Sequence, residues 1–317
     1  RMVRTIVKIE NLVTRYGSLV ALDHLNLEVK EGEILGLLGP NGSGKTTALN
    51  CLLALLKYDK GTITVFDKEM HPTSYALKRE IGVVPQNIAV FEKMTVQENI
   101  DYFCGLYVTD KQRRRTLTEE ALTFAGLTEY RKMLPKKLSG GLLRRLNIAC
   151  GIVHQPKLIL MDEPTVAVDP QSRNRILEGI LELNRQGSTI IYTSHYMEEV
   201  EQICTRVAIL DGGEVAEEGK VSEVFAAPQS RAAKRLVYPD GYEQPVVKFD
   251  EGKMLRVVFN GAKATKTPLI AQMAIDCGIT ASILGASTKG IGEKAYGNML
   301  LGIPGGDAEL ARAMDYL

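Results

Sequence analysis

Residues 39–47 read GPNGSGKTT, the most specific pattern in this chain of 317 residues. An apolar segment with strand character precedes it at 33–38, and a segment with a helical pattern follows it. In this context the backbone amides of the glycine-rich loop and the N-terminus of the helix bind phosphate. Lys45 would reach the β- and γ-phosphates of a nucleotide, and Thr46 would ligate Mg²⁺. The residues assigned to ATP binding in this loop are Gly39, Pro40, Asn41, Gly42, Ser43, Gly44, Lys45, Thr46 and Thr47.

A second predicted strand, 158–161, ends in the two acids Asp162 and Glu163. Phosphoryl transfer needs alignment, charge neutralisation and a positioned nucleophile rather than covalent chemistry by the protein. Asp162 can hold Mg²⁺ through water, and Glu163 can polarise an attacking water. Two acids at a strand end are by themselves compatible with a solvated surface, but a P-loop in the same chain favours nucleotide hydrolysis.

A third motif, LSGG at 138–141, stands at the start of a predicted helix. Ser139 can cap that helix, and Gly140 and Gly141 leave its first amides open to an anion. By itself this is a common helix cap. Between a P-loop and an acidic strand end, however, it resembles the signature motif of ATP-binding cassette (ABC) proteins.

The resemblance to ABC proteins extends over residues 5 to about 225 and implies roles for further side chains. Tyr16 resembles the aromatic residue that stacks on adenine, and Gln86 the Q-loop glutamine that senses Mg²⁺ and couples to the permease. Asp169 resembles the D-loop aspartate, and His195 the switch histidine that contacts the γ-phosphate. The catalytic set is then Glu163, His195 and Gln86, the metal set is Thr46, Gln86 and Asp162, and the signature set that contacts ATP in the partner subunit is Ser139, Gly140 and Gly141.

The resemblance also implies partners. In ABC proteins two nucleotide-binding domains face each other, and each ATP lies between one P-loop and the other subunit's signature motif, so a homodimer with membrane permease subunits is expected. Two positions depart from the family pattern: Leu142 stands where most members have Gln, and Ala167 where Gly is frequent. Both could change the hydrolysis rate, although neither removes a phosphate contact.

Composition excludes several classes of protein. Basic and acidic residues balance, 39 against 38, which argues against a protein that binds nucleic acid by neutralising phosphates. Apolar runs are too short for a membrane-spanning helix, and the N-terminus lacks the apolar core of a secretory signal. The 5 cysteines include no C-x-x-C pair, which favours free thiols over a zinc site. With the ABC resemblance, we expect a peripheral protein at the cytoplasmic face of the cell membrane.

The pattern of segments predicts the fold class and the domains. Strands alternate with helices to about 210, which indicates an α/β P-loop NTPase fold over 1–225 with a helical subdomain inserted at about 88–155. Within it, the basic run 111–115 is interpreted as a solvated helix face rather than a partner contact. A proline-containing linker is predicted at 226–245. The rest, 246–317, forms an α+β unit.

This C-terminal unit has the order β-α-β-β-α, a ferredoxin-like plan that lacks its last strand. The predicted strands are 254–259, 280–287 and 295–302. Helices are predicted at 268–277 and from Asp307, whose carboxylate is a plausible N-cap.

Two parts of the chain resemble different ABC subfamilies. Residues 30–219 resemble the ATPases that partner six-helix exporters of drugs, lipids or polysaccharides. From about residue 221 the chain resembles the methionine importer ATPase and its C-terminal regulatory domain, which implies methionine as a regulator. Candidate pocket residues, for most of which core packing is the better interpretation, are Leu269, Ile270, Met273, Ile283, Leu284, Met299 and Leu300.

The leading hypothesis is an ABC transporter subunit that hydrolyses ATP and moves substrate by ATP-driven dimerisation, with a C-terminal domain that senses methionine. One alternative is an exporter-type ATPase whose C-terminal domain is a dimerisation module, and another is a soluble ABC ATPase without a permease. Whether the two resemblances reflect a natural fusion or an engineered chimera stays open at this point.

Overall fold

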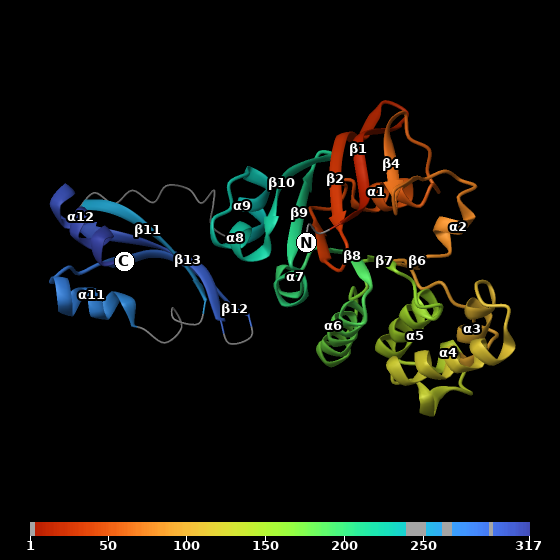
Figure 1. Ribbon diagram of the computed structural model, residues 1–317. Coiled ribbons are helices and arrows are strands. Elements are labelled where there is room, and N and C mark those ends of the chain that lie inside the picture. Colours follow the sequence, from red (N-terminus) through yellow and green to blue (C-terminus); the bar gives the residue numbers. More distant parts are fainter. Residues whose placement is uncertain (1–3, 239–251, 262–267, 292–293) are drawn as a thin grey trace. The chain divides into compact units, whose positions relative to one another are not determined.

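The computed structural model describes residues 4–238, 252–261, 268–291 and 294–317 (Figure 1). The chain divides into two compact units, Arg1–Ala233 and Lys234–Leu317, and each is described by itself. Within the described ranges, no helix combines the length and the apolar character that a membrane span requires.

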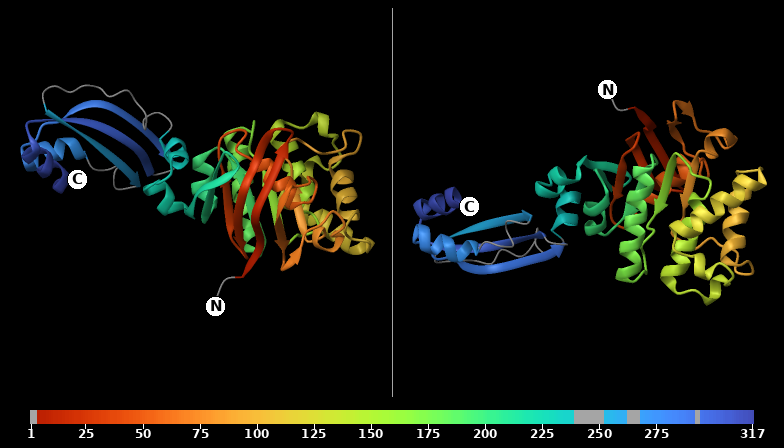
Figure 2. Two further views of the ribbon diagram at one scale, coloured as in Figure 1. Left: turned by 90° about the horizontal axis from the view of Figure 1, so that it is seen from above. Right: turned by 60° about the horizontal axis from the view of Figure 1, so that its bottom comes forward.

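The first unit contains an antiparallel sheet with the strand order β2-β1-β4-β5. Its strands are β1 (Thr5–Tyr16), β2 (Leu19–Lys30), β4 (Lys60–Val65) and β5 (Lys68–Glu69). Their inward residues share one hydrophobic core with the parallel sheet and with α1 (Lys45–Leu52). Figure 2 (left) shows this sheet, in red and orange, in front of the green strands. The helix that follows the P-loop is therefore packed between two sheets.

The second sheet of this unit has the order β10-β9-β3-β8-β7-β6. Its strands are β3 (Ile34–Leu38), β6 (Ile81–Val84), β7 (Leu158–Asp162), β8 (Thr189–Ser194), β9 (Arg206–Asp211) and β10 (Glu214–Lys220). β3, β6, β7, β8 and β9 run parallel, and every residue of β3, β7 and β8 is buried. Leu38 lies beside Ser194 and Asp162 beside Thr193, so the predicted site residues meet at the carboxyl edge of the sheet.

A buried ion pair secures the opposite, amino end of the parallel sheet. Both Arg206 on β9 and Glu33 before β3 are largely buried, and Arg206 Nη2 lies 2.8 Å from Glu33 Oε1 while its Nε donates to Glu33 Oε2 at 3.2 Å. Two parallel hydrogen bonds of this kind fix the orientation of both side chains. The pair holds β9 in register with β3, on which the P-loop follows.

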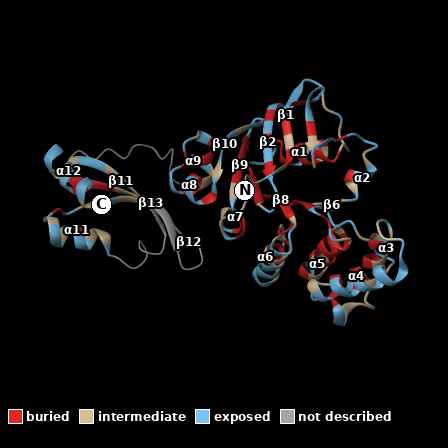
Figure 3. Ribbon diagram, in the orientation of Figure 1, coloured by how far each residue is buried: buried red, intermediate tan, exposed pale blue. Residues whose placement is uncertain are grey.

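Helices α2 (Tyr75–Lys78), α6 (Pro170–Arg185), α7 (Met197–Ile203), α8 (Val221–Ala226) and α9 (Arg231–Val237) complete the α/β part. The inserted subdomain contains α3 (Val96–Gly105), α4 (Lys111–Phe124) and α5 (Gly140–Ile152), with 3₁₀ turns at Thr128–Tyr130 and Pro135–Lys137. These helices bury their own apolar cluster, and Figure 3 shows α5 as the most buried of the three.

Helix α4 begins at Lys111 and therefore includes the basic run 111–115. Asp110 accepts from Arg113 N at 2.6 Å, so the helix starts with the basic run. That run is mostly exposed, and Arg114 pairs with Asp101 at 2.9 Å. Its geometry is that of a solvated helix face, as interpreted from the sequence.

One segment differs from its prediction: the predicted linker contains helix α9, where Ser230 Oγ accepts from Ala233 N at 3.0 Å. A hydroxyl cap and helix-forming residues outweigh the neighbouring prolines here. Residues 239–245 of the predicted linker lie outside the described ranges.

The second unit contains β11 (Gly252–Gly261), α11 (Leu269–Cys277), β12 (Ser282–Ile291), β13 (Lys294–Pro304) and α12 (Asp307–Tyr316). Both neighbouring strand pairs are antiparallel, in the order β11-β13-β12. This is the arrangement of the first three strands of a ferredoxin-like fold, so the predicted fold class is confirmed for both parts of the chain. The predicted absence of a fourth strand stays a prediction.

The core of the second unit contains Met273, Ile279, Leu301, Ile303 and Ala313. The candidate pocket residue Met273 is therefore a core residue, while Ile283 is 58% exposed. The prediction that Asp307 caps the last helix is wrong. Gly306 precedes the helix, and its N–H donates to Glu309 Oε2 at 2.9 Å, because a glutamate three positions later reaches back to this amide.

Candidate functional site

The P-loop follows β3 and leads into α1, as the sequence predicts. Gly44 precedes the helix with φ +107°, a backbone conformation that side chains with a Cβ rarely adopt. A Cβ here would also lie 2.9 Å from the carbonyl oxygen of Ala21. Ser43 Oγ is buried and has no hydrogen-bond partner among the described residues. The loop thus brings backbone amides and an unpaired hydroxyl to the place where a phosphate would bind.

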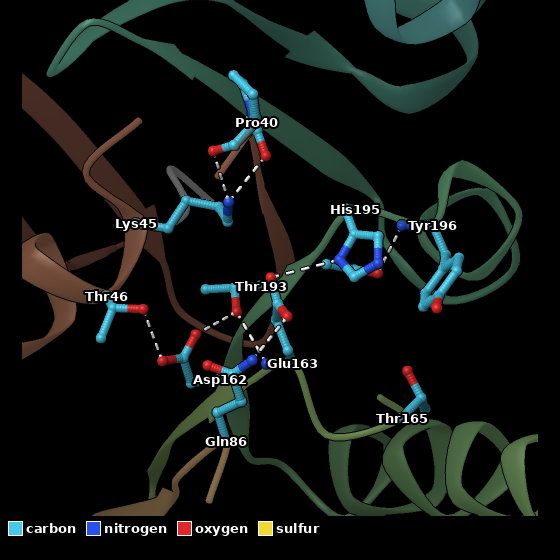
Figure 4. A network of polar contacts seen from close by, with 12 residues as sticks. Pro40, Lys45, Thr46, Gln86, Asp162, Glu163, Thr165, Thr193, His195 and Tyr196 are labelled. Atoms are coloured by element: carbon cyan, nitrogen blue, oxygen red, sulfur yellow. Dashed lines mark hydrogen bonds and ion pairs between the residues drawn. The ribbon is translucent and has the colours of Figure 1, made fainter. Parts of the chain in front are cut away.

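Lys45, the charged residue of the loop, is buried, with 6% of it exposed. Its Nζ donates to the carbonyl oxygens of Gly39 at 2.8 Å and Pro40 at 3.1 Å (Figure 4). Burial lowers the pKa of the Lys45 ammonium, and the negative charges of Glu163 and Asp162 oppose this shift. A phosphate would offer the ammonium charged acceptors in place of neutral carbonyls, so the resting geometry prepares the lysine for an anion.

Both carboxylate oxygens of Asp162 accept a hydrogen bond from a threonine hydroxyl. Thr46 Oγ1 donates to Oδ2 at 2.8 Å, and Thr193 Oγ1 donates to Oδ1 at 2.6 Å. A hydroxyl and a carboxylate are oxygen ligands that suit Mg²⁺, which usually takes one or two carboxylates together with phosphates and water. No group of three or more His, Cys, Asp or Glu residues capable of holding a metal occurs in the described part of the chain. The donors therefore fit a cation that arrives with a nucleotide.

Glu163 lies between the other two predicted catalytic residues. Gln86 Nε2 donates to its Oε2 at 3.1 Å, and His195 Nδ1 lies 3.4 Å from its Oε1 (Figure 4). The backbone of Glu163 has φ +46°, and its N–H donates to Thr193 Oγ1 at 2.9 Å. A non-glycine residue in this region is uncommon and marks a conformation imposed by its surroundings. The structure therefore fixes this carboxylate from its backbone and from both oxygens.

Ser139 and Asp169 cap the helices that carry the signature motif and the D-loop. Ser139 Oγ accepts from Leu142 N at 3.3 Å, and Asp169 Oδ1 accepts from Ser172 N at 2.9 Å. The backbone hydrogen bond at Ser172 lowers the pKa of Asp169. The predicted cap at Ser139 is confirmed, and the structure shows in addition that the D-loop residue Asp169 is an N-cap.

The two signature glycines have different surroundings. Around Gly140 a Cβ would meet nothing within 4 Å, whereas a Cβ on Gly141 would lie 2.6 Å from Ser172 Cβ and 3.0 Å from Asp169 Oδ2. Gly141 is therefore required by the close approach of α5 to α6 within the same chain. Sequence reasoning missed this contact, because a glycine pair before a helix gives no signal for which neighbour approaches it.

Tyr16 ends β1 and is 50% exposed, which leaves its ring face available for stacking. Thr193 and Ser194, directly before His195, belong to strand β8. The side chain of Thr193 is consequently buried and orders Asp162 and Glu163, a role that sequence reasoning missed. The sequence signal for this role was the polar pair Thr193 and Ser194 at the end of an apolar strand.

The structure explains one of the two departures from the ABC pattern, the leucine at 142. Leu142 packs against the apolar cluster of the helical subdomain. Ala167 has φ +58°, the conformation for which glycine is the usual residue.

Replacing Ala167 by Gly is expected to raise the free energy of unfolding by about 0.5–1 kcal/mol. A left-handed backbone costs a residue with a Cβ roughly 1–2 kcal/mol in the folded state, and glycine removes this strain. Glycine also stabilises the unfolded chain by about 0.4–1 kcal/mol, because it has more conformational freedom there, and this offsets part of the gain. Denaturant unfolding measures the difference. Ala149→Gly, in the middle of α5, is the matched control and should destabilise. Equal destabilisation by both variants would show that the backbone at 167 is unstrained.

Comparison with known proteins agrees with this geometry. Residues 22–166 match the family described as ABC transporter, and residues 253–317 match the NIL domain. The linearmycin resistance ATP-binding protein LnrL of Bacillus subtilis is 43% identical over 206 residues, which are 65% of this chain and 66% of that protein. The methionine import ATP-binding protein MetN of Geobacillus kaustophilus is 32% identical over 314 residues, which are 95% of this chain and 92% of that protein.

Solved structures place the first unit among similar cassettes. The dimeric post-hydrolysis state of the ATP-binding cassette MJ0796 with ADP and Pi has a TM-score of 0.63 at 29% identity, and covers 68% of this chain and 99% of that one. For cbiO1 of Clostridium perfringens, part of the cbiONQ transporter complex, the TM-score is 0.65 at 29% identity, with 70% and 91% covered.

Proposed function

This chain belongs to the ABC transporter family of ATP-binding proteins, and from that premise we propose that its ATPase activity drives methionine transport through a membrane permease under the control of its C-terminal unit. The observation that carries the proposal is the match of residues 253–317 to the NIL domain, within a similarity to methionine import proteins that extends over 92% of the MetN protein of Geobacillus kaustophilus. The ATPase activity follows from the family, and the substrate and its regulatory role are the proposal.

We assign the steps of hydrolysis to the residues around Glu163. The P-loop amides and Lys45 bind the phosphates, and the carboxylate of Glu163 accepts a proton from the attacking water. His195 and Gln86 contact the same carboxylate from either side, which supports a role in orienting it. Mg²⁺, bound with the nucleotide by Thr46, Gln86 and Asp162, would neutralise developing charge on the phosphates.

We further assign Ser139 and Gly140 to the γ-phosphate of an ATP held by a second copy of the chain. The open surroundings of Gly140 support this assignment. Similarity to a cassette that was solved as a dimer with ADP and Pi supports the homodimer. Tyr16, with its exposed ring, would stack on the adenine of the nucleotide bound by the P-loop of the same subunit.

The surface proposed for the permease lies next to Gln86. Phe91 stacks on Phe103 with ring centroids 5.8 Å apart and meets the edge of Tyr102 at 4.9 Å. Both Phe91 and Tyr102 are exposed. Asn99, fully buried, holds this loop in place by exchanging hydrogen bonds with the N–H and C=O of Phe91 at 2.7 and 3.0 Å. A rigid, exposed aromatic group suits a protein partner better than water, and supports a permease as the partner at this surface.

A second candidate function is supported by the first unit alone. A linearmycin resistance ATP-binding protein is 43% identical over 206 residues, against 32% over 314 residues for the methionine import protein. An exporter-type ATPase would use the C-terminal unit as a dimerisation surface rather than as a sensor. The two functions make opposite predictions for added methionine.

Titrating L-methionine into the full chain is expected to release heat and, with the permease assembled, to slow ATP hydrolysis by roughly 5-fold or more. A regulator of this kind acts through different affinities for two arrangements, and such couplings are typically about 5- to 150-fold. L-Leucine is the control ligand, because it matches methionine in size without its thioether. Absence of heat together with concentration-dependent self-association would eliminate the sensor and favour the exporter-type reading.

A further inference from the structure

Glu199, on α7, is a buried acid that the steps of hydrolysis described above do not use. It is 2% exposed, and its Oε2 accepts three hydroxyl groups: Tyr192 at 2.6 Å, Thr165 at 2.8 Å and Ser194 at 3.0 Å. Burying a carboxylate is costly unless several donors satisfy it. Three donors from two segments of the chain are therefore committed to one side chain.

Arg173 on α6 is the cation that faces Glu199. Its Nε lies 3.3 Å from Glu199 Oε1, and the arginine side chain is 27% exposed. Neither atom has a hydrogen-bond partner within the described residues, so the pair is close but not aligned. The guanidinium also lies 4.9 Å from the centre of the Tyr196 ring, a cation–π contact.

Tyr196 completes a chain of contacts to the catalytic site. Its ring centre is 4.2 Å from that of His195, and His195 Nδ1 lies 3.4 Å from Glu163 Oε1. Glu199 thus reaches His195 through Arg173 and Tyr196. It reaches the same loop a second way, since Ser194 Oγ, which donates to Glu199, accepts from Tyr196 N at 2.9 Å.

The three segments that meet at Glu199 each carry a residue assigned to hydrolysis. Thr165 is two positions after Glu163, and Ser194 directly precedes His195. Arg173 stands in the first turn of α6, where its N–H donates to the carbonyl of Asp169 at 2.9 Å. One carboxylate therefore joins the acid, the switch histidine and the D-loop aspartate.

We propose that Glu199 is a positioning residue for ATP hydrolysis, which acts through Arg173 and Tyr196 to hold His195 and the D-loop helix in register with Glu163. This rests on the proposed roles of Glu163 and His195, and not on methionine as the substrate. Because the Arg173–Glu199 contact is unaligned, it can shorten or lengthen when the D-loop helix moves. The orientation of His195 then follows the position of α6.

The alternative is that Glu199 and Arg173 form a buried pair that only stabilises the fold. The chain offers a matched control for this, since Glu33 and Arg206 are also a largely buried pair, at the opposite end of the parallel sheet. Glu33→Gln and Glu199→Gln make the same chemical change. Only one of them lies on the contact chain to His195.

The test measures kcat and KM for ATP, and the thermal unfolding temperature, for the full chain and its variants. Glu199→Gln is expected to lower kcat by roughly 10- to 100-fold with KM changed by less than about 3-fold, a typical effect of misplacing a catalytic group. Glu33→Gln should lower the unfolding temperature and leave kcat of the folded protein unchanged. A fall in kcat for both variants in proportion to their loss of stability would overturn the proposal.

Arg173 variants keep the test decisive if Glu199→Gln does not fold. Arg173→Met should lower kcat about as much as Glu199→Gln, and Arg173→Lys, which keeps the charge, should restore part of it. The double variant Arg173→Met with Glu199→Gln should be no slower than the slower single variant, because the two residues act as one unit. The proposal would be refuted if the fold-losses in kcat of the two single variants multiplied in the double variant, or if Arg173→Met had normal kcat. An inactive wild-type chain would instead count against the assigned hydrolysis.

Discussion

Glu163→Gln is expected to lower ATP turnover by roughly 100-fold or more and to leave ATP binding intact, a typical cost of losing a positioned acid or base. The glutamine amide has the shape of the carboxylate but cannot accept a proton from water at neutral pH. The P-loop and Asp162, which are proposed to bind the phosphates and the cation, keep their contacts. Single-turnover hydrolysis and a nucleotide titration measure the two quantities separately.

The same variant should accumulate as an ATP-bound dimer, because a closed pair of subunits opens again only after hydrolysis. Size-exclusion chromatography with and without ATP tests this. Glu198→Gln is the matched control, since that acid is exposed on the same helix as Glu199, and it should hydrolyse ATP normally. Near-normal turnover in Glu163→Gln would mean that another group polarises the water, and His195 would be the first to examine.

Lys45→Ala is expected to weaken ATP binding on the order of 100-fold. Hydrogen bonds from a charged group are worth about 1.5–3 kcal/mol each, and the ammonium can make more than one to the β- and γ-phosphates. Its present partners, the carbonyls of Gly39 and Pro40, are neutral and easily exchanged. Calorimetry with ATP in the presence of Mg²⁺ gives the dissociation constant.

The control for this variant is Lys57→Ala, which removes an exposed lysine shortly after α1. It should bind ATP like the unaltered chain, while both variants should have far-ultraviolet spectra of the folded protein. Unchanged ATP affinity in Lys45→Ala would show that the P-loop is not part of the nucleotide site. The roles assigned to the residues around Glu163 would then lose their basis.

Part of the site was predictable because several functional residues stand directly at the ends of apolar strands. The P-loop, Asp162 and His195 each follow an apolar strand, and parallel strands bring such ends to one edge. The contact of Gln86 with Glu163 is different. It depends on the path of the loop after β6, and only the resemblance to ABC proteins indicated it.

Other features could not be derived from local pattern. The position of Glu199 depends on how α7 packs against α6, and a glutamate in a short helix is usually solvated. Asp307 was misassigned as a cap because the helix begins one residue earlier than expected, with Gly306 as the N-cap and Glu309 accepting from its N–H. The glycine at 141 gave a clear motif, but its tightest contact is with a helix that starts 29 positions later in the chain.

That contact has a consequence for how the chain can evolve. An alanine at 141 would meet Ser172 Cβ at 2.6 Å, and turning the serine hydroxyl away would not remove the overlap, because the Cβ does not move with it. Relief requires glycine at 172 or a shift of α6, so a substitution at 141 alone displaces the neighbouring helix. Drift through single substitutions is blocked at such a pair. The glycine is then retained in part because of packing between two helices of one subunit, a constraint that would persist in a descendant that no longer bound a nucleotide.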